Sequence, residues 1–529
     1  MSERIYNPPD PQRVTEGLRD TGYSFVTAVA DLIDNAIAAN AENVAITLAM
    51  DYRGNIELNV ADDGEGMIRD SLIDAMRYGS PERPNPMSLG KYGLGLKTAS
   101  TAFCRQLNVT TRPGDRDSAL KAVLDLDDLG DWEISLETPA PEDLSALDNL
   151  VGDGTGTVIT WRKVDRLIKA YKDPGGKHAQ NALGRYERHL TNHVGMVYQR
   201  YLDASDSRAR TVKITINGNE IEPWNPFIPD ESELASTDTW DIDLGNGLSG
   251  KLSLRAYILP AKGHFSSDEA ARRAQVSNQL QGIYIYREGR LIHGPDWLGI
   301  YNKEPHGSLL RVEFSFNHEL DRAFHIDIKK SRIELDQALY DALVDFLKPL
   351  RREADLRYRK GVQKVVSSKA ESAHNSSNEN IRGKEADIDA ATLEPDPDSD
   401  GVRVTNPEGT FTIRVTKSEP TDAKQVFVQP VDGIDDGLLW EPVYSQGHTG
   451  VRINTKHPYY HKVYVPNLTS GVTIQGMDSL LWALVVAEFN TMNERVQEHF
   501  IAVRSEVSKI LRKLVVDMPD PPEDSGDDD

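Results

Sequence analysis

Apolar residues recur at helical spacing in the first clear element of the chain, between Ser24 and Ala41. This period predicts an amphipathic helix whose apolar side is formed by Phe25, Val29, Leu32, Ala36 and Ile37. From residue 43 the pattern changes to alternation, which predicts the strands NVAITLAM and NIELNVAD, joined by a turn at DYRGN. Further strands are expected in QLNVTTR, SALKAVLDL, WEISLE and TGTVITWRKV. Residues 1–165 are therefore expected to form a mixed α/β domain.

The rest of the chain is predicted to form two further domains separated by a linker. Residues 166–365 start with a helical pattern and end with another from about Asp336, and between them lie the strand candidates VKITING, GKLSLRAYILP, GIYIYREGRLI and LLRVEFSFN. Residues 366–401 are poor in apolar residues and rich in Ser, Asn, Asp and Glu, which predicts a flexible, disordered linker. Residues 402–516 combine short strands with a long helical pattern, as in a small α+β domain. The overall fold class is α+β.

Charge and cysteine content exclude several classes of protein. The chain of 529 residues has a net charge of −23, so it is not a generic binder of polyanions. Residues 517–529 hold seven acids and no base, which predicts a disordered acidic tail. The single cysteine, Cys104, excludes an internal disulfide, and we expect it to be buried on a helix. No apolar run reaches the ~18–20 residues of a membrane span and MSERIYNPPDPQ has no signal core, so we expect a cytoplasmic protein without membrane contact.

Two acids and an amide interrupt the apolar pattern of the first helix, in AVADLIDNAIAAN. Asp31 and Asn35 are four residues apart and share one face of the helix, and Asp34 lies beside them. A solvated face explains these residues. A polar pocket is the alternative, because an amide can bind a metal and an acid can polarise a water molecule.

Three later segments carry glycines next to short polar residues. VADDGEGM directly follows a strand, and its Gly64 and Gly66 suit either a turn or a loop whose backbone approaches a ligand closely. SLGKYGLGLKTAS runs from glycines into a helical pattern, whose unpaired N–H groups favour phosphate, but it lacks the GK[ST] ending of a Walker loop. GDGTGTVITW leads from a turn into a strand.

Together and in this order, the four segments closely resemble the motifs of the GHKL ATPase superfamily, which includes gyrase B, the heat-shock chaperone, histidine kinases, MutL and MORC. ADLIDNAIAA looks like the helix motif of the superfamily, and DDGEGM looks like its adenine-contacting motif. GKYGLGLKTAS is similar to the lid and phosphate motif, and TGT looks like the last motif. The resemblance covers about 165 residues in detail, extends more weakly to about residue 340, and is nearest to MORC- and MutL-like prokaryotic ATPases. It implies a Bergerat-type α/β sandwich that binds ATP and Mg²⁺, followed by a transducer-like α/β domain.

The resemblance implies a role for each matched residue. Asn35 would coordinate Mg²⁺ at the phosphates, and Asp62 would accept a hydrogen bond from the adenine amino group. Gly64, Gly66 and Met67 would shape the adenine pocket, and Thr157 would support it. A mobile lid in YGSPERPNPMS would cover the phosphates, and the residues implied to hold them are Gly90, Lys91, Tyr92, Gly93, Leu94, Gly95, Leu96 and Lys97.

The resemblance also implies two catalytic positions, Asp31 and Lys330. Asp31 occupies the general-base position, where the family usually has glutamate. The shorter side chain sets its carboxylate back by about 1 Å, and a misplacement of that size costs ~100-fold in rate. In two-domain members a transducer lysine reaches the γ-phosphate, and in HIDIKKSRIELD the candidate is Lys330, with Lys329 and Arg332 as alternatives. A basic turn before a helix explains the same segment.

Several functions stay open on the sequence. The first is an ATP-gated dimeric clamp of MORC or MutL type in DNA processing, restriction or phage defence, with double-stranded DNA or defence proteins as partners. In such a homodimer the segment PPDPQRVTEGLRDTGYS would swap across to the partner's lid. The alternatives are a chaperone-like ATPase acting on protein clients and an ATP-sensing switch with very weak hydrolysis. A histidine kinase is disfavoured because only about 20 residues precede the ATPase helix.

Overall fold

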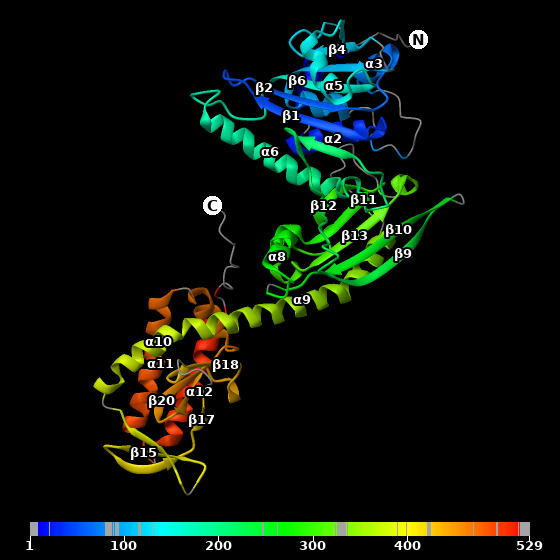
Figure 1. Cartoon of the computed structure of the whole chain (residues 1–529). Helices are drawn as coiled ribbons and strands as arrows, with labels where there is room; N and C mark the ends of the chain where they lie inside the picture. The colour runs from blue at the N-terminus through cyan, green and yellow to red at the C-terminus, as the bar shows by residue number, and fades with distance from the viewer. Residues whose placement is uncertain are drawn as a thin grey trace, which may run out of the picture. The chain divides into compact units, whose positions relative to one another are not determined.

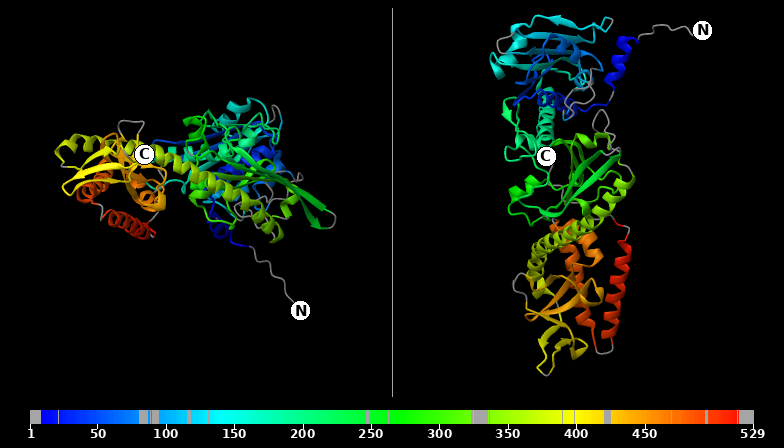
Figure 2. Two further views of the ribbon diagram at one scale, coloured as in Figure 1. Left: turned by 90° about the horizontal axis from the view of Figure 1, so that it is seen from below. Right: turned by 90° about the vertical axis from the view of Figure 1, so that its right-hand side faces the viewer.

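The chain divides into two compact units, residues 1–260 with 264–358, and residues 359–529 with 261–263. Figures 1 and 2 show the computed structural model from three directions. The residues that it describes are 9–20, 22–79, 87, 89, 95–114, 118–130, 132–245, 248–261, 263–322, 324, 335, 337–388, 390–397, 399–419, 425–468, 470–493, 496–516 and 518.

An eight-stranded mixed sheet, in the order β5-β4-β3-β6-β2-β1-β7-β8, forms the first half of the N-terminal unit (Figure 1). The predicted hairpin is confirmed, because β1 and β2 pair antiparallel with Leu48 opposite Leu58. Cys104 is buried as expected, but it begins strand β3 and so the helix predicted around it is wrong. The bounds are β1 Asn43–Met50, β2 Ile56–Asp62, β3 Cys104–Arg112, β4 Leu120–Asp125, β5 Ser135–Glu137, β6 Gly156–Val164, β7 Lys213–Ile216 and β8 Asn219–Glu220.

Strands β7 and β8 extend this sheet beyond residue 165, where the sequence pattern placed the end of the first domain. β7 pairs parallel with β1, with Val44 opposite Ile214. The segment VKITING, expected in the second domain, therefore completes the first sheet. Its alternation of apolar and polar residues identifies a strand but carries no information about which sheet the strand joins.

Helices pack on both faces of the eight-stranded sheet. Leu58 and Val60 of β2 belong to the main core together with Leu32 of α2, whereas Ala61 packs with Leu147 of α5 in a smaller cluster. Because successive side chains of a strand point to opposite faces, α2 and α5 lie on opposite sides of the sheet. The helices of this half are α1 Pro11–Arg19, α2 Phe25–Ala38, α3 Arg69–Met76, α4 Gly95–Thr101, α5 Pro141–Val151, α6 Lys177–Val197 and α7 Gln199–Leu202.

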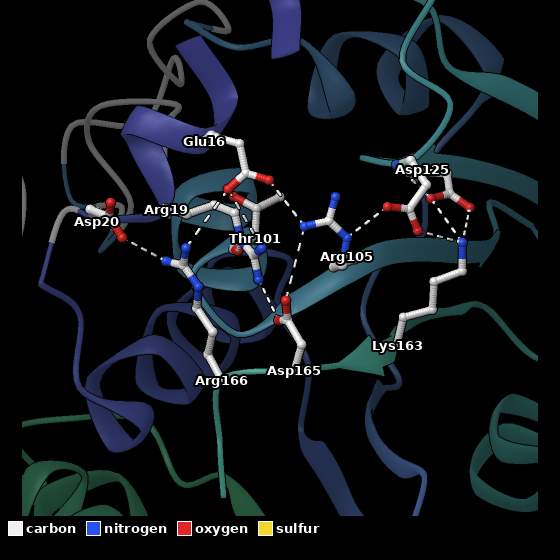
Figure 3. Close-up of polar contacts among 10 residues, drawn as sticks. Glu16, Arg19, Asp20, Thr101, Arg105, Asp125, Lys163, Asp165 and Arg166 are labelled. Carbon is white, nitrogen blue, oxygen red and sulfur yellow. Dashed lines mark hydrogen bonds and ion pairs between the residues drawn. The ribbon is translucent and has the colours of Figure 1, made fainter. Parts of the chain in front are cut away.

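Helix α1, from the segment predicted to swap to a partner, is held against its own chain by ionic contacts (Figure 3). The guanidinium of Arg19 is buried, donates to the Thr101 carbonyl oxygen at 2.7 Å and pairs with Asp165. Glu16 pairs with Arg105 at 3.0 Å. These contacts fix α1 beside the end of α4, and its exchange with a partner stays a prediction.

A five-stranded sheet, in the order β12-β11-β13-β10-β9, forms the second half of the N-terminal unit. Tyr284 and Tyr286 of β11 are fully buried and pack in the main core. The sequence pattern did not predict β9, whose residues STDTWDID carry few apolar side chains. The bounds are β9 Glu233–Gly245, β10 Leu248–Ile258, β11 Gly282–Arg287, β12 Arg290–Asp296, β13 Leu310–Phe316, α8 Asp268–Ala274 and α9 Gln337–Ala373.

The C-terminal unit contains a three-stranded and a four-stranded sheet with helices packed around one core (Figure 2). The four-stranded sheet has the order β17-β19-β20-β18. Its elements are α10 Asn375–Lys384, β14 Thr392–Pro395, β15 Val402–Asn406, β16 Gly409–Ile413, β17 Thr416–Ser418, β18 Val428–Val431, β19 Trp440–Ser445, β20 His448–Asn454, a π-helix at Tyr460–Tyr464, α11 Gly471–Thr491 and α12 Gln497–Leu514. This composition agrees with the α+β class expected here.

The structure corrects the flexible linker predicted at residues 366–401, because helices and a strand lie in this segment. Helix α9 runs on to Ala373, α10 follows directly, and β14 begins at Thr392. His374, Ser377 and Asn378 are fully buried, and the Asn378 amide donates to the Val428 carbonyl oxygen at 3.0 Å. Ile381 and Leu393 also join the core of this unit, so a few buried apolar residues and several buried polar contacts are enough to order a segment of low apolar content.

Helix α11 is long and apolar enough, by length and composition alone, to cross a membrane. Of its apolar window, 44% is buried within the structure, where Ile474, Trp482 and Val485 belong to the core. Asp478 and Glu488 interrupt the apolar run and are themselves buried. A core helix passes the same test, so the helix is weak evidence for a membrane span.

Candidate functional site

Helix α2 is the element that positions the polar residues of AVADLIDNAIAAN. The Ser24 side chain caps its start by accepting from the Thr27 N–H at 3.3 Å, which satisfies one of the free donors of the first turn. Phe25 is buried edge-on against Phe103 and Trp161. This anchoring fixes the rotation of α2 and therefore the direction of each polar side chain on it.

The polar residues of α2 lie in two different environments. Asp31 and Asn35 are both half-buried, one turn apart on the same face. The Tyr23 hydroxyl donates to Oδ2 of Asp31 at 2.9 Å. A Cβ atom on Gly95 would approach the same oxygen to 3.3 Å, so the start of α4 lies against Asp31. Asp34, one turn from Asp31, is in contrast fully buried.

Asp62 ends strand β2 and is almost completely buried, opposite Thr157 of β6 in the sheet register. Its Oδ1 accepts from the Gly64 N–H at 2.9 Å. Burial raises the pKa of Asp62 to about 7, and the neighbouring carboxylate of Asp63 acts in the same direction, whereas hydrogen bonds from backbone N–H groups oppose the shift. A carboxyl group kept in this environment is a strong acceptor for a buried hydrogen-bond donor.

The glycines of VADDGEGM are required by the protein's own backbone. A Cβ on Gly64 would lie 2.7 Å from the Ala39 carbonyl oxygen, just past the end of α2. Gly66 has φ +66°, and a Cβ there would lie 2.0 Å from the Arg112 carbonyl oxygen. The Glu65 N–H also donates to the Ala39 carbonyl oxygen at 3.0 Å. The loop after Asp62 is thereby tied to the helix that carries Asp31 and Asn35.

A chain of hydrogen bonds joins Met67 to Thr157 through Thr111, which the sequence reading did not single out. The Met67 N–H donates to Thr111 Oγ1 at 2.9 Å, and the Thr111 and Thr157 hydroxyl oxygens lie 3.0 Å apart. Thr111 is fully buried near the end of β3. The available signal was its place in QLNVTTR, where two threonines end a strand next to the TGT segment.

Of the glycine-rich segment, the structure describes Leu89, which is buried in the main core, and the residues from Gly95 onward. Leu96 is half-buried against the main core, and Lys97 is almost fully buried on α4. The Lys97 ammonium donates to the Ala75 carbonyl oxygen at 2.8 Å, in the last turn of α3. Gly90, Lys91, Tyr92, Gly93 and Leu94 lie outside the described residues, as do Lys329, Lys330 and Arg332 and most of the predicted lid.

The oxygen atoms on the half-buried face of α2 are of the type that Mg²⁺ binds. Asp31 and Asn35 supply a carboxylate and an amide one turn apart, and Mg²⁺ takes oxygen ligands, typically from one or two side chains, phosphates and water. Among the described residues, no group of three or more His, Cys, Asp or Glu side chains is placed to hold a metal ion. The residues thus fit a metal ion that one or two protein side chains bind, with phosphates and water as its remaining ligands.

Comparison with protein families identifies the domain that carries these residues. Residues 23–157 match the family described as histidine kinase-, DNA gyrase B- and HSP90-like ATPases. The match extends from Tyr23 to Thr157 and so includes Asp31, Asn35 and Asp62. The chain therefore contains a GHKL-type ATPase domain, which agrees with the fold class expected from the sequence.

Other comparisons add little about function. No curated protein matches the sequence. Among solved structures, the chain is similar to one described as the N-terminal domain of a DNA repair protein, with 16% identity, 67% of this chain and 99% of that chain covered, and a TM-score of 0.37. A likeness at that identity and TM-score carries no argument about what this chain does.

Proposed function

We propose that the chain is a Mg²⁺-dependent ATPase whose nucleotide binds between the half-buried face of α2 and the end of β2. One observation carries this proposal. The loop that follows Asp62 contacts Ala39 at the end of α2, the helix that carries Asp31 and Asn35, in a domain that matches an ATPase family. The ATPase part is proposed to span residues 1–165, with β7 and β8 completing its sheet, and the transducer-like part the remainder of residues 166–365, in a cytoplasmic protein.

Each side chain has a specific task in this proposal. Asn35 would hold Mg²⁺ through its amide oxygen, and the ion would supply charge neutralisation at the phosphates. Asp62 would accept from the adenine amino group, with Gly64, Gly66, Met67 and Thr157 around the ring. Residues 90–97 would hold the phosphates beneath the lid in YGSPERPNPMS, and Lys330 would contact the γ-phosphate from the second part of the unit.

Asp31 would act as the general base on the attacking water. Its hydrogen bond from Tyr23 fixes the orientation of the carboxylate, which a shorter side chain needs if it is to reach the water. Because a misplacement of about 1 Å costs ~100-fold in rate, we expect slow turnover.

The test of the proposed activity is ATP turnover by wild type, Asp31→Ala and Asn35→Ala, in Mg²⁺ and in EDTA. We expect turnover only with Mg²⁺, a loss of at least ~100-fold in Asp31→Ala, and weaker nucleotide binding in Asn35→Ala. Equal rates for wild type and Asp31→Ala would remove Asp31 from catalysis. Nucleotide binding without any turnover would favour the ATP-sensing switch.

For the biological role we propose an ATP-gated homodimeric clamp of MORC or MutL type in DNA processing or prokaryotic defence. This finer proposal is supported by the resemblance of GKYGLGLKTAS and its neighbouring motifs to those families. Turnover with and without double-stranded DNA, together with gel shifts at two salt concentrations, tests it, since binding through phosphates weakens as salt rises. Stimulation by unfolded protein instead of DNA would favour the chaperone-like alternative.

A further inference from the structure

The buried side of α2 is attached to the second half of the unit through Asp34. Asp34 is fully buried, and its Oδ1 accepts from Arg290 Nε at 2.8 Å. The Tyr198 hydroxyl lies 2.7 Å from the same oxygen and 2.7 Å from the Ala30 carbonyl oxygen of α2. One carboxylate oxygen thus joins three segments that are far apart in the sequence.

Arg290 comes from the five-stranded sheet and has little freedom to move. It is the first residue of β12, directly after the turn at Glu288 and Gly289, both of which have positive φ. Its side chain is 7% exposed, and a second nitrogen donates to the Leu291 carbonyl oxygen at 3.1 Å. Burial alone would lower the pKa of Arg290, but Asp34, Tyr198 and Asp31 together more than offset this effect, so the pKa is raised.

Arg210 holds the end of the same helix. Its guanidinium donates to the Ala41 carbonyl oxygen at 2.7 Å and to the Ile37 carbonyl oxygen at 2.6 Å. A cation at this position satisfies free carbonyl groups and interacts favourably with the helix dipole. Contacts with Tyr198, Arg210 and Arg290 therefore fix the position of α2, and all three residues lie after residue 190.

We propose that Arg290 is a positioning residue that acts through Asp34 to place the Asp31–Asn35 face of α2 for hydrolysis. Asp34 adjoins Asn35 and is three residues from Asp31 on one rigid helix, so a shift of Asp34 moves both. The inference rests on the proposed ATPase function. It adds that the rate of turnover depends on the five-stranded sheet, through a contact that does not touch the nucleotide.

A purely structural ion pair is the alternative, and the chain offers a matched control for it. Arg287 and Asp321 form a second buried pair in the same half of the unit, with Nε to Oδ1 at 2.6 Å and side-chain exposures of 7% and 8%. Arg287 is the last residue of β11, three positions before Arg290. A structural role predicts similar effects at both pairs, whereas positioning predicts an effect on kcat at Arg290 and Asp34 alone.

The experiment compares Arg290→Lys and Asp34→Asn with Arg287→Lys and Asp321→Asn in the full chain. For each variant we would measure the folded fraction, the Kd of a non-hydrolysable ATP analogue and kcat per folded molecule. We expect kcat to fall at least ~10-fold in the first pair with Kd within ~3-fold of wild type, and kcat within ~2-fold of wild type in the control pair.

Several outcomes would overturn the inference. These are an unchanged kcat in Arg290→Lys and Asp34→Asn, an equal fall in the control pair, or a loss of activity that only follows the loss of folded protein. Arg290→Lys keeps a cation beside Asp34, so it remains informative if Asp34→Asn folds poorly. A wild type that neither binds nor hydrolyses ATP would refute the proposed function instead, which separates the two failures.

Discussion

The buried carboxylate of Asp62 lowers the stability of the folded chain when it is ionised, and in the proposed function a bound nucleotide offsets this cost. Its folded pKa of about 7 lies above the ordinary 3.8, so the folded state binds more protons between these values and stability falls as pH rises from about 4 to 7. With about 1.4 kcal/mol per pKa unit, the ionised carboxylate costs roughly 4 kcal/mol above pH 7. We predict that Asp62→Asn raises the Tm at pH 8 and that this gain shrinks at pH 5, as thermal unfolding would measure.

The same substitution is expected to weaken nucleotide binding at least ~10-fold. The side-chain amide of the variant would bring two N–H donors near the adenine amino group, which is itself a donor, and an unpaired buried donor costs about 1–3 kcal/mol. Calorimetric titration with an ATP analogue checks this. A variant that gains no stability at pH 8, or that binds as well as wild type, would contradict the role given to Asp62.

Gly66 is the glycine whose replacement the structure penalises most directly in this loop. A Cβ there meets the Arg112 carbonyl oxygen at 2.0 Å, and φ is positive. Gly218 also has a positive φ, +80°, but a Cβ there meets nothing within 4 Å. We predict that Gly218→Ala lowers the free energy of unfolding by about 1 kcal/mol, from the backbone conformation alone. Gly66→Ala should cost about 2 kcal/mol more, and urea unfolding of both variants isolates the clash.

Residue positions that follow from local spacing were predictable, and those set by distant partners were not. The helical period places Asp31 and Asn35 on one face, and both are half-buried there. Nothing local distinguishes Asp34, whose burial depends on a cation 256 positions later. Likewise, the glycines of the Asp62 loop indicated a turn, but the contacts that require them come from residues 39 and 112.

At the scale of elements, Arg19 is the buried residue among those that hold α1 by ionic contacts. Arg19 donates to the Thr101 carbonyl oxygen at the end of α4 and pairs with Asp165, and its side chain is 1% exposed (Figure 3). Arg166 pairs with Asp20 of the same segment but is 35% exposed. We predict that Arg19→Met releases α1, because it removes the buried hydrogen bond to Thr101, and a hydrogen bond from a charged group contributes about 1.5–3 kcal/mol. Hydrogen exchange over residues 11–19 should rise sharply in that variant.

Arg166→Met is the control, since exposed ion pairs contribute only about 0–1 kcal/mol. Its exchange rates over α1 should stay near those of wild type. Similar exchange in both variants would mean that α1 is held by other contacts. Release of α1 in Arg19→Met would also identify the contact that a partner-swapped arm has to break.

Elements whose apolar residues recur with a helical or strand period were predictable, whereas elements held largely by buried polar contacts were not. The apolar alternation identified β1 to β4 and β10 to β13 correctly. Residues 366–401 lack that signal, yet His374 lies 2.6 Å from Asp478 through Nδ1, and Asn378 donates to the backbone of β18. Composition measures the hydrophobic contribution to folding alone, so a segment ordered by hydrogen bonds is read as a linker.

At the scale of the whole molecule, the net charge of −23 opposes the association of two copies. The proposed clamp nevertheless requires ATP-dependent dimerisation. We predict that a non-hydrolysable ATP analogue with Mg²⁺ shifts the mass in solution from 58.9 kDa to twice that value, measured by light scattering. Asn35→Ala, which should bind Mg²⁺ and the analogue weakly, is the control and is expected to stay at the monomer mass.

The salt dependence of the dimerisation constant is a second, independent test of this prediction. Like-charged copies repel over a Debye length of about 30 Å at 0.01 M salt and about 8 Å at 0.15 M. The dimerisation constant at saturating analogue should therefore increase with salt, opposite to the weakening expected for contact with DNA phosphates. A mass that does not respond to the analogue would contradict the clamp. Dimers that dissociate as salt rises would instead mean that attractive ion pairs at the interface outweigh the overall repulsion.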